Sequence, residues 1–201
     1  MTTAKDLFII AVDAEPSCPV GQGDLSLALA GAEVIDLLRA EALMLAGDRM
    51  VPTRQPATDD PLLTEAASSL ALQVPYERVE DWLWRRGRDL SATYLAAFEE
   101  AGLLTRQRRG RLSLGAVRMA LADSPARRRA MNRWAADEPV LAALAAVVGI
   151  HDVHSTDSPG AVDDTVTTVL AAVDEAVLEL EAVRQRRAFE NAAFANIWRG
   201  A

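Results

Sequence analysis

The hydrophobic pattern of the chain is dominated by one stretch, Leu25–Leu45, with the sequence LSLALAGAEVIDLLRAEALML. Its first half is apolar on every side of a helix and carries small residues among the leucines. A helix without a polar face must be surrounded by other protein or by lipid. The charges of Glu33, Asp36 and Arg39 make a membrane span costly. The pattern therefore predicts a buried central helix that ends near Ala40.

Helical periodicity, with apolar residues three and four positions apart, recurs on both sides of this stretch. Asp60 and Ser124 stand in capping positions just before a proline, and Asp24 is expected to cap the central helix. The predicted helices cover Thr3–Val12, Leu25–Ala40, Asp60–Leu72, Pro75–Gly87, Leu90–Ala101, Ser124–Trp134, Asp137–Val148 and Asp163–Trp198, the last with a break near Arg186. This is the pattern of a multi-helix bundle.

Two short stretches alternate apolar and polar residues around a tight turn and predict β-hairpins. The first is Leu43–Val51, with a Gly-Asp turn. The second is Leu103–Leu114, with an arginine-rich turn at residues 108–110. The sequence therefore predicts an all-α fold in a single domain over residues 1–201, in which a central buried helix lies in a multi-helix bundle with one or two small β-hairpins.

Composition and charge indicate where in the cell the protein is expected. The chain has 201 residues, and its net charge of −8 opposes non-specific binding to nucleic acid or to an anionic membrane by the whole surface. The single Cys18 cannot form an internal disulfide, and no secretory signal or lipidation motif is found. We expect a cytoplasmic protein that could lie peripherally on the inner membrane face.

No arrangement of residues predicts a catalytic site, and no phosphate-binding glycine loop or zinc-protease motif is found. His151 and His154 are three residues apart in a loop rich in Ser, Asp and Pro, but no other His or Cys is near them in the sequence to complete a metal site. We therefore expect that the protein is not an enzyme and has no catalytic residues, no metal and no cofactor.

The arginines are concentrated in the middle of this acidic chain. Between Arg85 and Arg133 the sequence has twelve arginines and four acids. Arginines near exposed aromatic side chains suit a phosphate-bearing partner, and the segment WLWRRGR places two tryptophans beside three arginines. The candidate lipid-binding residues are Arg85, Arg86, Arg88, Arg106, Arg108, Arg109 and Arg111. A solvated helix face next to an arginine-rich turn is the competing interpretation.

A helix followed by an arginine-tipped hairpin is also typical of winged-helix DNA-binding proteins. The helix Leu90–Ala101 would then read the DNA, but it has no Arg, Lys, Asn or Gln to contact base edges. Its Glu99 and Glu100 would face phosphate. We therefore expect no nucleic-acid partner.

Several segments together resemble the Golgi phosphoprotein 3 family, which has members in eukaryotes and relatives in actinobacteria. The resemblance covers nearly the whole chain. It is carried by DLFIIAVD at 6–13, LALAGAEVIDLL at 27–38, the Gly47-Asp48 hairpin, DDPLLTEA at 59–66, the proline-started helix with Trp82, and FEEAGLLT at 98–105. The small-residue central helix followed by the GLL hairpin is the most specific part.

The resemblance implies a helical domain with a projecting hairpin that binds phosphatidylinositol 4-phosphate and recruits glycosyltransferase tails. The family's headgroup pocket uses a Trp before the central helix, an Arg within it, and two Arg spaced i, i+3. The matching positions here hold Gly21, Ala30, Arg88 and Ser91, so one of the four residues is kept. The family hairpin also acts in oligomerisation, which implies a homo-oligomer through Leu103–Leu114.

We therefore expect a peripheral membrane or adaptor protein that binds an anionic phospholipid headgroup. The alternative is a protein-interaction or oligomerisation module that does not bind lipid. The sequence identifies neither the lipid nor the protein partner.

Overall fold

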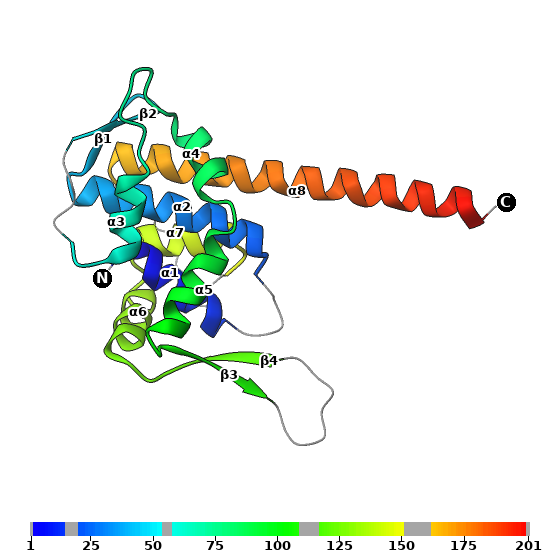
Figure 1. Ribbon diagram of the computed structural model, residues 1–201, viewed down its shortest axis with the longest axis horizontal. Helices are drawn as coiled ribbons and strands as arrows, with labels where there is room; N and C mark the ends of the chain where they lie inside the picture. Colours follow the sequence, from blue (N-terminus) through cyan, green and yellow to red (C-terminus); the bar gives the residue numbers. More distant parts are fainter. Residues whose placement is uncertain (1, 15–19, 54–57, 109–116, 151–161, 200–201) are drawn as a thin grey trace.

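The computed structural model describes residues 2–14, 20–53, 58–108, 117–150 and 162–199, with the backbone alone at 106–108, 117–118 and 192–199. In these residues the chain forms eight helices and two separate two-stranded sheets (Figure 1). The helices are α1 (Thr3–Asp13), α2 (Gln22–Arg39), α3 (Pro61–Ser68), α4 (Val79–Arg86), α5 (Leu90–Glu100), α6 (Pro125–Ala135), α7 (Pro139–Val147) and α8 (Asp164–Arg199). The strands are β1 (Leu43–Ala46), β2 (Arg49–Pro52), β3 (Leu104–Arg108) and β4 (Val117–Leu121). The predicted all-α fold with two small hairpins is confirmed.

Helix α2 is the centre of the bundle, as its apolar pattern predicts. Its residues 25–37 are all buried, and α1, α3, α4, α5, α7 and α8 pack around it. Small residues let neighbouring helices come close. At Gly31, a Cβ atom would overlap with Cγ2 of Val173, so α8 crosses α2 where a side chain is missing. None of the described helices combines the length and apolar composition of a membrane span.

Helix starts are predicted well where a side chain caps the helix. Asp60 accepts a hydrogen bond from the Leu62 amide at 3.1 Å, and Ser124 accepts one from Arg127 at 3.1 Å. The prediction that Asp24 caps α2 is wrong. The helix begins earlier, after Gly21, and the Asp24 carboxylate instead binds Arg184 of α8.

Two further helix boundaries differ from the prediction because tertiary contacts compete with local propensity. Helix α3 ends at Ser68 rather than Leu72. Helix α4 begins at Val79 rather than Pro75, because residues 77–79 form an extended segment beside β2. There the Met50 amide donates to the Glu77 carbonyl, and the Val79 amide donates to Asp48, both at 2.9 Å.

The second hairpin is longer than predicted. Its first strand, β3, follows the GLL segment as expected, and it pairs antiparallel with β4 from Leu104 opposite Leu121 to Arg108 opposite Val117. The predicted second arm, residues 111–115, lies outside the described residues, which resume at Val117. A continuous register without Gly or Pro in either strand explains the extra length.

Helix α8 continues without the predicted break near Arg186. Its first half packs on the bundle through Val166, Val169, Val173 and Ala176, and its second half extends past the other helices (Figure 1). Between 164 and 199 the sequence has no Gly or Pro, and the segment around Arg186 contains good helix formers. The change in apolar pattern there marks where α8 leaves the bundle.

Candidate functional site

The seven predicted arginines do not form one surface. Arg86 points into the core, where its guanidinium binds the fully buried Glu33 through Nε–Oε2 at 2.8 Å and Nη2–Oε1 at 3.1 Å. A second acid, Glu65, binds its outer side at 2.7 Å. Burial lowers the pKa of Arg86, but Glu33 and then Glu65 outweigh this effect and raise it overall. Arg86 is therefore occupied inside the protein.

Arg85 is on the surface but is also paired. Its Nε and Nη2 atoms each lie 2.7 Å from a carboxylate oxygen of Glu77, and Nη2 also donates to the Ser69 carbonyl. The guanidinium stands 5.1 Å from the ring centroid of Trp82, which is itself fully buried. Arg85 is therefore exposed, but its guanidinium is already paired with Glu77 and the Ser69 carbonyl.

The hairpin arginines lie elsewhere in the fold. Arg106 and Arg108 belong to β3, which follows the C-terminal end of α5, whereas Arg88 precedes its N-terminal end. Only the backbone is described at Arg106 and Arg108, and Arg109 and Arg111 lie outside the described residues. No hairpin residue contributes to the described walls of the cleft around Arg88.

Arg88 lines a cleft of about 650 Å³ between the start of α2, the α4–α5 turn and α8, here called the α2–α8 cleft. Its walls consist of Gln22, Gly23, Ser26, Leu27, Trp84, Gly87, Arg88, Asp89, Ser91, Ala92, Leu180 and Arg187. A volume of this size is typical of a small-ligand site. Arg88 and Ser91, two of the four positions that the sequence resemblance matched to headgroup-binding residues, are among its residues.

Short contacts between α2 and the α4–α5 turn fix the floor of the cleft. The Ser26 hydroxyl accepts a hydrogen bond from the Ser91 amide at 3.0 Å and donates one to the Ser91 hydroxyl at 2.9 Å. A Cβ atom at Gly87 would overlap with the Leu83 carbonyl oxygen and would be 3.3 Å from Cδ2 of Leu27 on α2, so the turn has no room for a side chain there. These contacts place Arg88 at the rim, where it is exposed.

Helix α8 forms the opposite wall. Arg184 binds both carboxylate oxygens of Asp24 through Nη1, at 2.7 and 2.8 Å. Gly23 permits this approach, because a Cβ atom there would be 2.8 Å from Leu180 and 2.7 Å from Arg184. Arg187 follows Arg184 by about one helical turn and so lies on the same side of α8, in the cleft wall.

The cleft presents two guanidinium groups that have no partner within the described residues. Neither Arg88 nor Arg187 makes a hydrogen bond or ion pair there, and both are exposed. The half-buried Trp84 offers an aromatic face, and Asp89 contributes one opposing charge. Two free guanidiniums beside the Ser26 and Ser91 hydroxyls are suited to a phosphate or another oxyanion.

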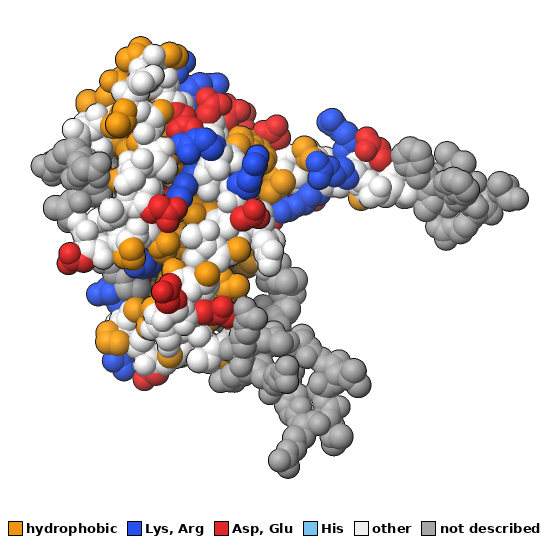
Figure 2. Space-filling model, viewed as in Figure 1, with side chains coloured by type: hydrophobic (Ala, Val, Ile, Leu, Met, Phe, Trp, Pro, Cys, Tyr) orange, Lys and Arg blue, Asp and Glu red, His pale blue; other side chains and the backbone are white. Residues whose placement is uncertain are grey.

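Several other arginines between residues 85 and 133 whose side chains are described also pair with an acid. Arg127 pairs with Asp13 at 2.8 Å, and Arg133 pairs with the buried Asp6 at 2.5 Å. Figure 2 shows basic and acidic side chains interspersed over the face in view, with no continuous basic patch. Among the side chains that the structure describes, the local excess of arginine in the sequence therefore does not become a basic surface.

The sequence interpretation missed Arg187, whereas Trp84 was noted as one of the two tryptophans of the segment WLWRRGR. Arg187 is about a hundred residues from Arg88, and only the crossing of α8 over the start of α2 brings the two to one cleft. Ala30, which the sequence resemblance matched to a headgroup arginine, is fully buried, and its carbonyl accepts the Trp82 indole N–H at 3.2 Å. Gly21 caps the start of α2, next to two residues of the cleft wall.

Comparison with known proteins gives one family match. A family model described as Golgi phosphoprotein 3 (GPP34) matches residues 4–188. No curated protein matches the chain. The match extends from α1 to Ala188, just after Arg187, and so includes every residue of the α2–α8 cleft.

Proposed function

Because the chain belongs to the Golgi phosphoprotein 3 family, we propose that it is a peripheral membrane or adaptor protein that binds an anionic lipid headgroup in the α2–α8 cleft. In this proposal the protein binds its ligand without transforming it and uses neither a metal nor a cofactor. The observation that carries the proposal is the pair of unpartnered guanidiniums, Arg88 and Arg187, on opposite walls of one cleft.

The negative net charge of the protein explains why binding to an anionic membrane needs a local basic site. With a net charge of −8, the protein as a whole is repelled by an anionic membrane. Two arginines near such a surface contribute about 1 kcal/mol each, which supports weak and reversible attachment. Charge-assisted hydrogen bonds from Arg88 and Arg187 to one phosphate add to this attraction and favour a headgroup that enters the cleft.

Phosphatidylinositol 4-phosphate, the lipid implied by the family, is one candidate for the headgroup. Ser91 stands where the family has its second paired arginine, so Arg187 is the residue we propose as the second phosphate contact. The Trp84 ring would then lie beside the headgroup in place of the family's loop tryptophan.

Vesicle co-sedimentation at low salt tests this proposal. The protein is mixed with phosphatidylcholine vesicles alone, or with vesicles that also contain phosphatidylserine or phosphatidylinositol 4-phosphate. We expect sedimentation only with anionic vesicles, and a loss of about fivefold in affinity for Arg88→Gln and for Arg187→Gln. Arg186→Gln is the matched control, because Arg186 is exposed on the same helix but does not line the cleft. Equal sedimentation with neutral vesicles, or equal losses for Arg186→Gln and Arg187→Gln, would contradict the proposal.

The hairpin provides the alternative function, because β3 and β4 extend from the bundle beside the end of α5 (Figure 1). Replacing Arg106, Arg108, Arg109 and Arg111 with Ala tests whether they attach the protein to vesicles. If only this variant loses sedimentation, the hairpin and not the cleft binds lipid. If replacing residues 107–118 with a two-residue Asn-Gly turn lowers the mass measured by light scattering, the hairpin mediates self-association.

A further inference from the structure

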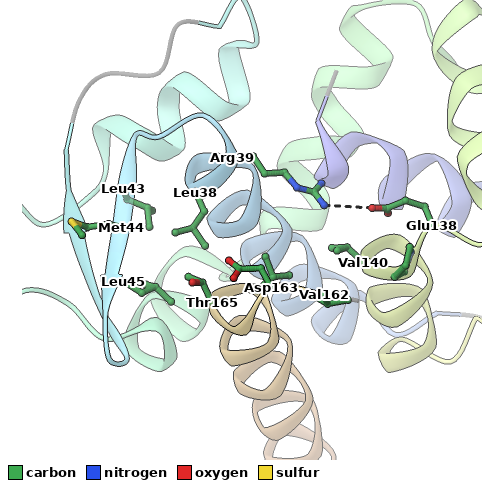
Figure 3. A pocket seen from close by; sticks show the side chains of 12 residues that line it. Leu38, Arg39, Leu43, Met44, Leu45, Glu138, Val140, Val162, Asp163 and Thr165 are labelled. Atoms are coloured by element: carbon green, nitrogen blue, oxygen red, sulfur yellow. Dashed lines mark hydrogen bonds and ion pairs between the residues drawn. The ribbon is translucent and has the colours of Figure 1, made fainter. Parts of the chain in front are cut away.

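A second hollow lies at the other end of the bundle, beside the first hairpin. It has a volume of about 570 Å³ and lies between β1, the end of α2, and the first turns of α7 and α8. Figure 3 shows Leu43 and Leu45 of β1 pointing toward the start of α8, with Leu38 and Val140 on the other walls. This apolar hollow, here called the β1 groove, shares no residue with the α2–α8 cleft.

The strand that forms one wall of the β1 groove has a free backbone edge. Leu45 is opposite Met50 in the hairpin, and the Met50 amide donates away from β1, to the Glu77 carbonyl at 2.9 Å. Leu45 and Met50 are therefore a non-hydrogen-bonded pair, and the N–H and C=O of Leu45 point away from β2. Leu43, two residues earlier, has the same orientation.

These backbone groups have no partner in the described part of the chain. No hydrogen bond joins the N–H or C=O of Leu43 or Leu45 to a described residue outside the hairpin. The outer edge of β2, in contrast, is covered by residues 77–79. The hairpin is thus closed along the outer edge of β2 and, among the described residues, open along the outer edge of β1, next to the groove that the Leu43 and Leu45 side chains line.

An open strand edge limits which class of molecule can bind to it. Alternating N–H and C=O groups along one line match the backbone of an extended polypeptide, which neither a lipid nor a nucleic acid presents. Such a peptide would place every second side chain against the apolar groove. Met44, between Leu43 and Leu45, points to the opposite face of β1 (Figure 3) and is 55% exposed.

An unpaired acidic side chain at the rim of the groove favours a peptide that carries a basic residue. Asp163, just before α8, is exposed, and its carboxylate has no partner within the described residues. The other acid of the groove, Glu138, is already held by Arg133 at 3.0 Å and by the Leu141 amide at 2.9 Å. Asp163 is therefore available to a basic side chain of the bound peptide.

We propose that the β1 groove binds an extended segment of a partner protein as an additional strand on β1, with alternating apolar side chains in the groove and a basic residue at Asp163. This site is independent of lipid binding. It gives the protein a second ligand of a different class, on a different surface.

The test uses the full chain and an array of fluorescein-labelled octapeptides. These alternate Val, Ile, Leu or Phe with Ser, and each is made with either Arg or Glu at one end. Binding is measured by fluorescence anisotropy, and amide exchange of Leu43 and Leu45 is measured with the tightest peptide. Thr165→Trp, which fills the groove, is compared with Thr167→Trp, which lies on the same helix outside it. Leu45→Pro removes one outward N–H without removing a hairpin hydrogen bond.

We expect the Arg-ended peptides to bind more tightly than the Glu-ended ones and to slow exchange at Leu43 and Leu45. Thr165→Trp, Leu45→Pro and N-methylation of alternate peptide amides should each weaken binding at least tenfold, and Thr167→Trp should not. The proposal is overturned if no peptide binds, or if N-methylated peptides bind equally well. It is also overturned if Leu43 and Leu45 are protected without peptide while the mass doubles, because β1 then pairs with a second copy of the chain.

Discussion

Arg86 and Glu33 form a two-point ion pair inside the bundle, with contacts of 2.8 and 3.1 Å. Glu33 has no exposed surface, and the Tyr94 hydroxyl donates a third hydrogen bond to it at 3.1 Å. Burial raises the pKa of Glu33, and Arg86 and Tyr94 offset only part of this effect. Together with Tyr94, the pair joins α2, α4 and α5. In the sequence, Arg86 is only one of several arginines in a basic run.

The first prediction concerns this pair. Arg86→Leu should lower the free energy of unfolding by about 3–5 kcal/mol, because it leaves the Glu33 carboxylate buried without its charge partner. Arg85→Leu is the control. Its guanidinium is bound by Glu77, but the Arg85 side chain is 47% exposed, so the loss should stay below about 1 kcal/mol. Urea unfolding followed by circular dichroism measures both, and similar losses would show that Arg86 is not the structural residue we describe.

The second prediction concerns pH and Asp36. This carboxylate is buried in α2 and accepts hydrogen bonds from the Thr3 and Ala4 amides at 2.9 and 3.0 Å. Burial raises the pKa of Asp36 above its ordinary value of 3.8, and these hydrogen bonds offset the effect only in part. In the window between the two pKa values the folded state binds more protons than the unfolded state. Its contribution to stability is therefore present below pH 3.8 and is lost as pH rises through the raised folded pKa.

The measurement is the free energy of unfolding in urea at several pH values from 4 to 7. Asp36→Asn removes this proton linkage, so its stability should fall less steeply with rising pH than that of the unaltered protein. The difference in slope is limited to about 1.4 kcal/mol per pH unit for one group. An equal or steeper decline in the Asn variant would contradict the assignment, whatever the absolute stability of that variant.

The sequence predicts the fold well because the fold depends on local patterns. The apolar stretch of α2, the capping side chains at Asp60 and Ser124 and the turn at Gly47 can each be recognised within a few residues. Errors occur where a distant contact decides the outcome. Asp24 has the right chemistry for a cap, but Arg184, far along the chain, binds it instead.

The candidate site is less predictable for the same reason. A count of charges along the chain assigns Arg86 and Arg133 to a basic surface, but in the fold each one lies beside a buried acid, Glu33 or Asp6. Arg187 belongs to a second short basic run, RQRR at 184–187, outside the middle of the chain, and the sequence alone does not tell which of its three arginines stay unpaired. Which arginines are available depends on packing between α2, α4 and α8.

The third prediction concerns the α2–α8 crossing. In Gly31→Ala the new methyl group would overlap with Val173, and overpacking of this kind costs about 1–3 kcal/mol. The higher helix propensity of Ala returns up to about 1 kcal/mol of that loss. The double variant Gly31→Ala with Val173→Ala should therefore be more stable than the sum of the two single losses predicts. Additive losses in a double-mutant cycle by urea unfolding would show that the two residues do not meet.

The fourth prediction concerns Asp24 and separates two roles for its ion pair with Arg184. The apolar contacts of α8 with the bundle, from Val166 to Leu180, do not involve this pair, so α8 should stay in place without it. Asp24→Asn removes an acid beside the α2–α8 cleft and frees the Arg184 guanidinium. Its affinity for anionic vesicles should therefore rise about fivefold, while Arg184→Gln should lower or not change it.

If the pair instead holds α8 in position, both variants would bind anionic vesicles more weakly. Glu181→Gln is the control, because Glu181 lies 3.8 Å from Arg184 but outside the cleft wall and should change affinity less than Asp24→Asn does. All three variants are compared by co-sedimentation at low salt and again at high salt. Screening by salt should reduce the differences among them, because the proposed effect is electrostatic. Differences that persist at high salt would contradict it.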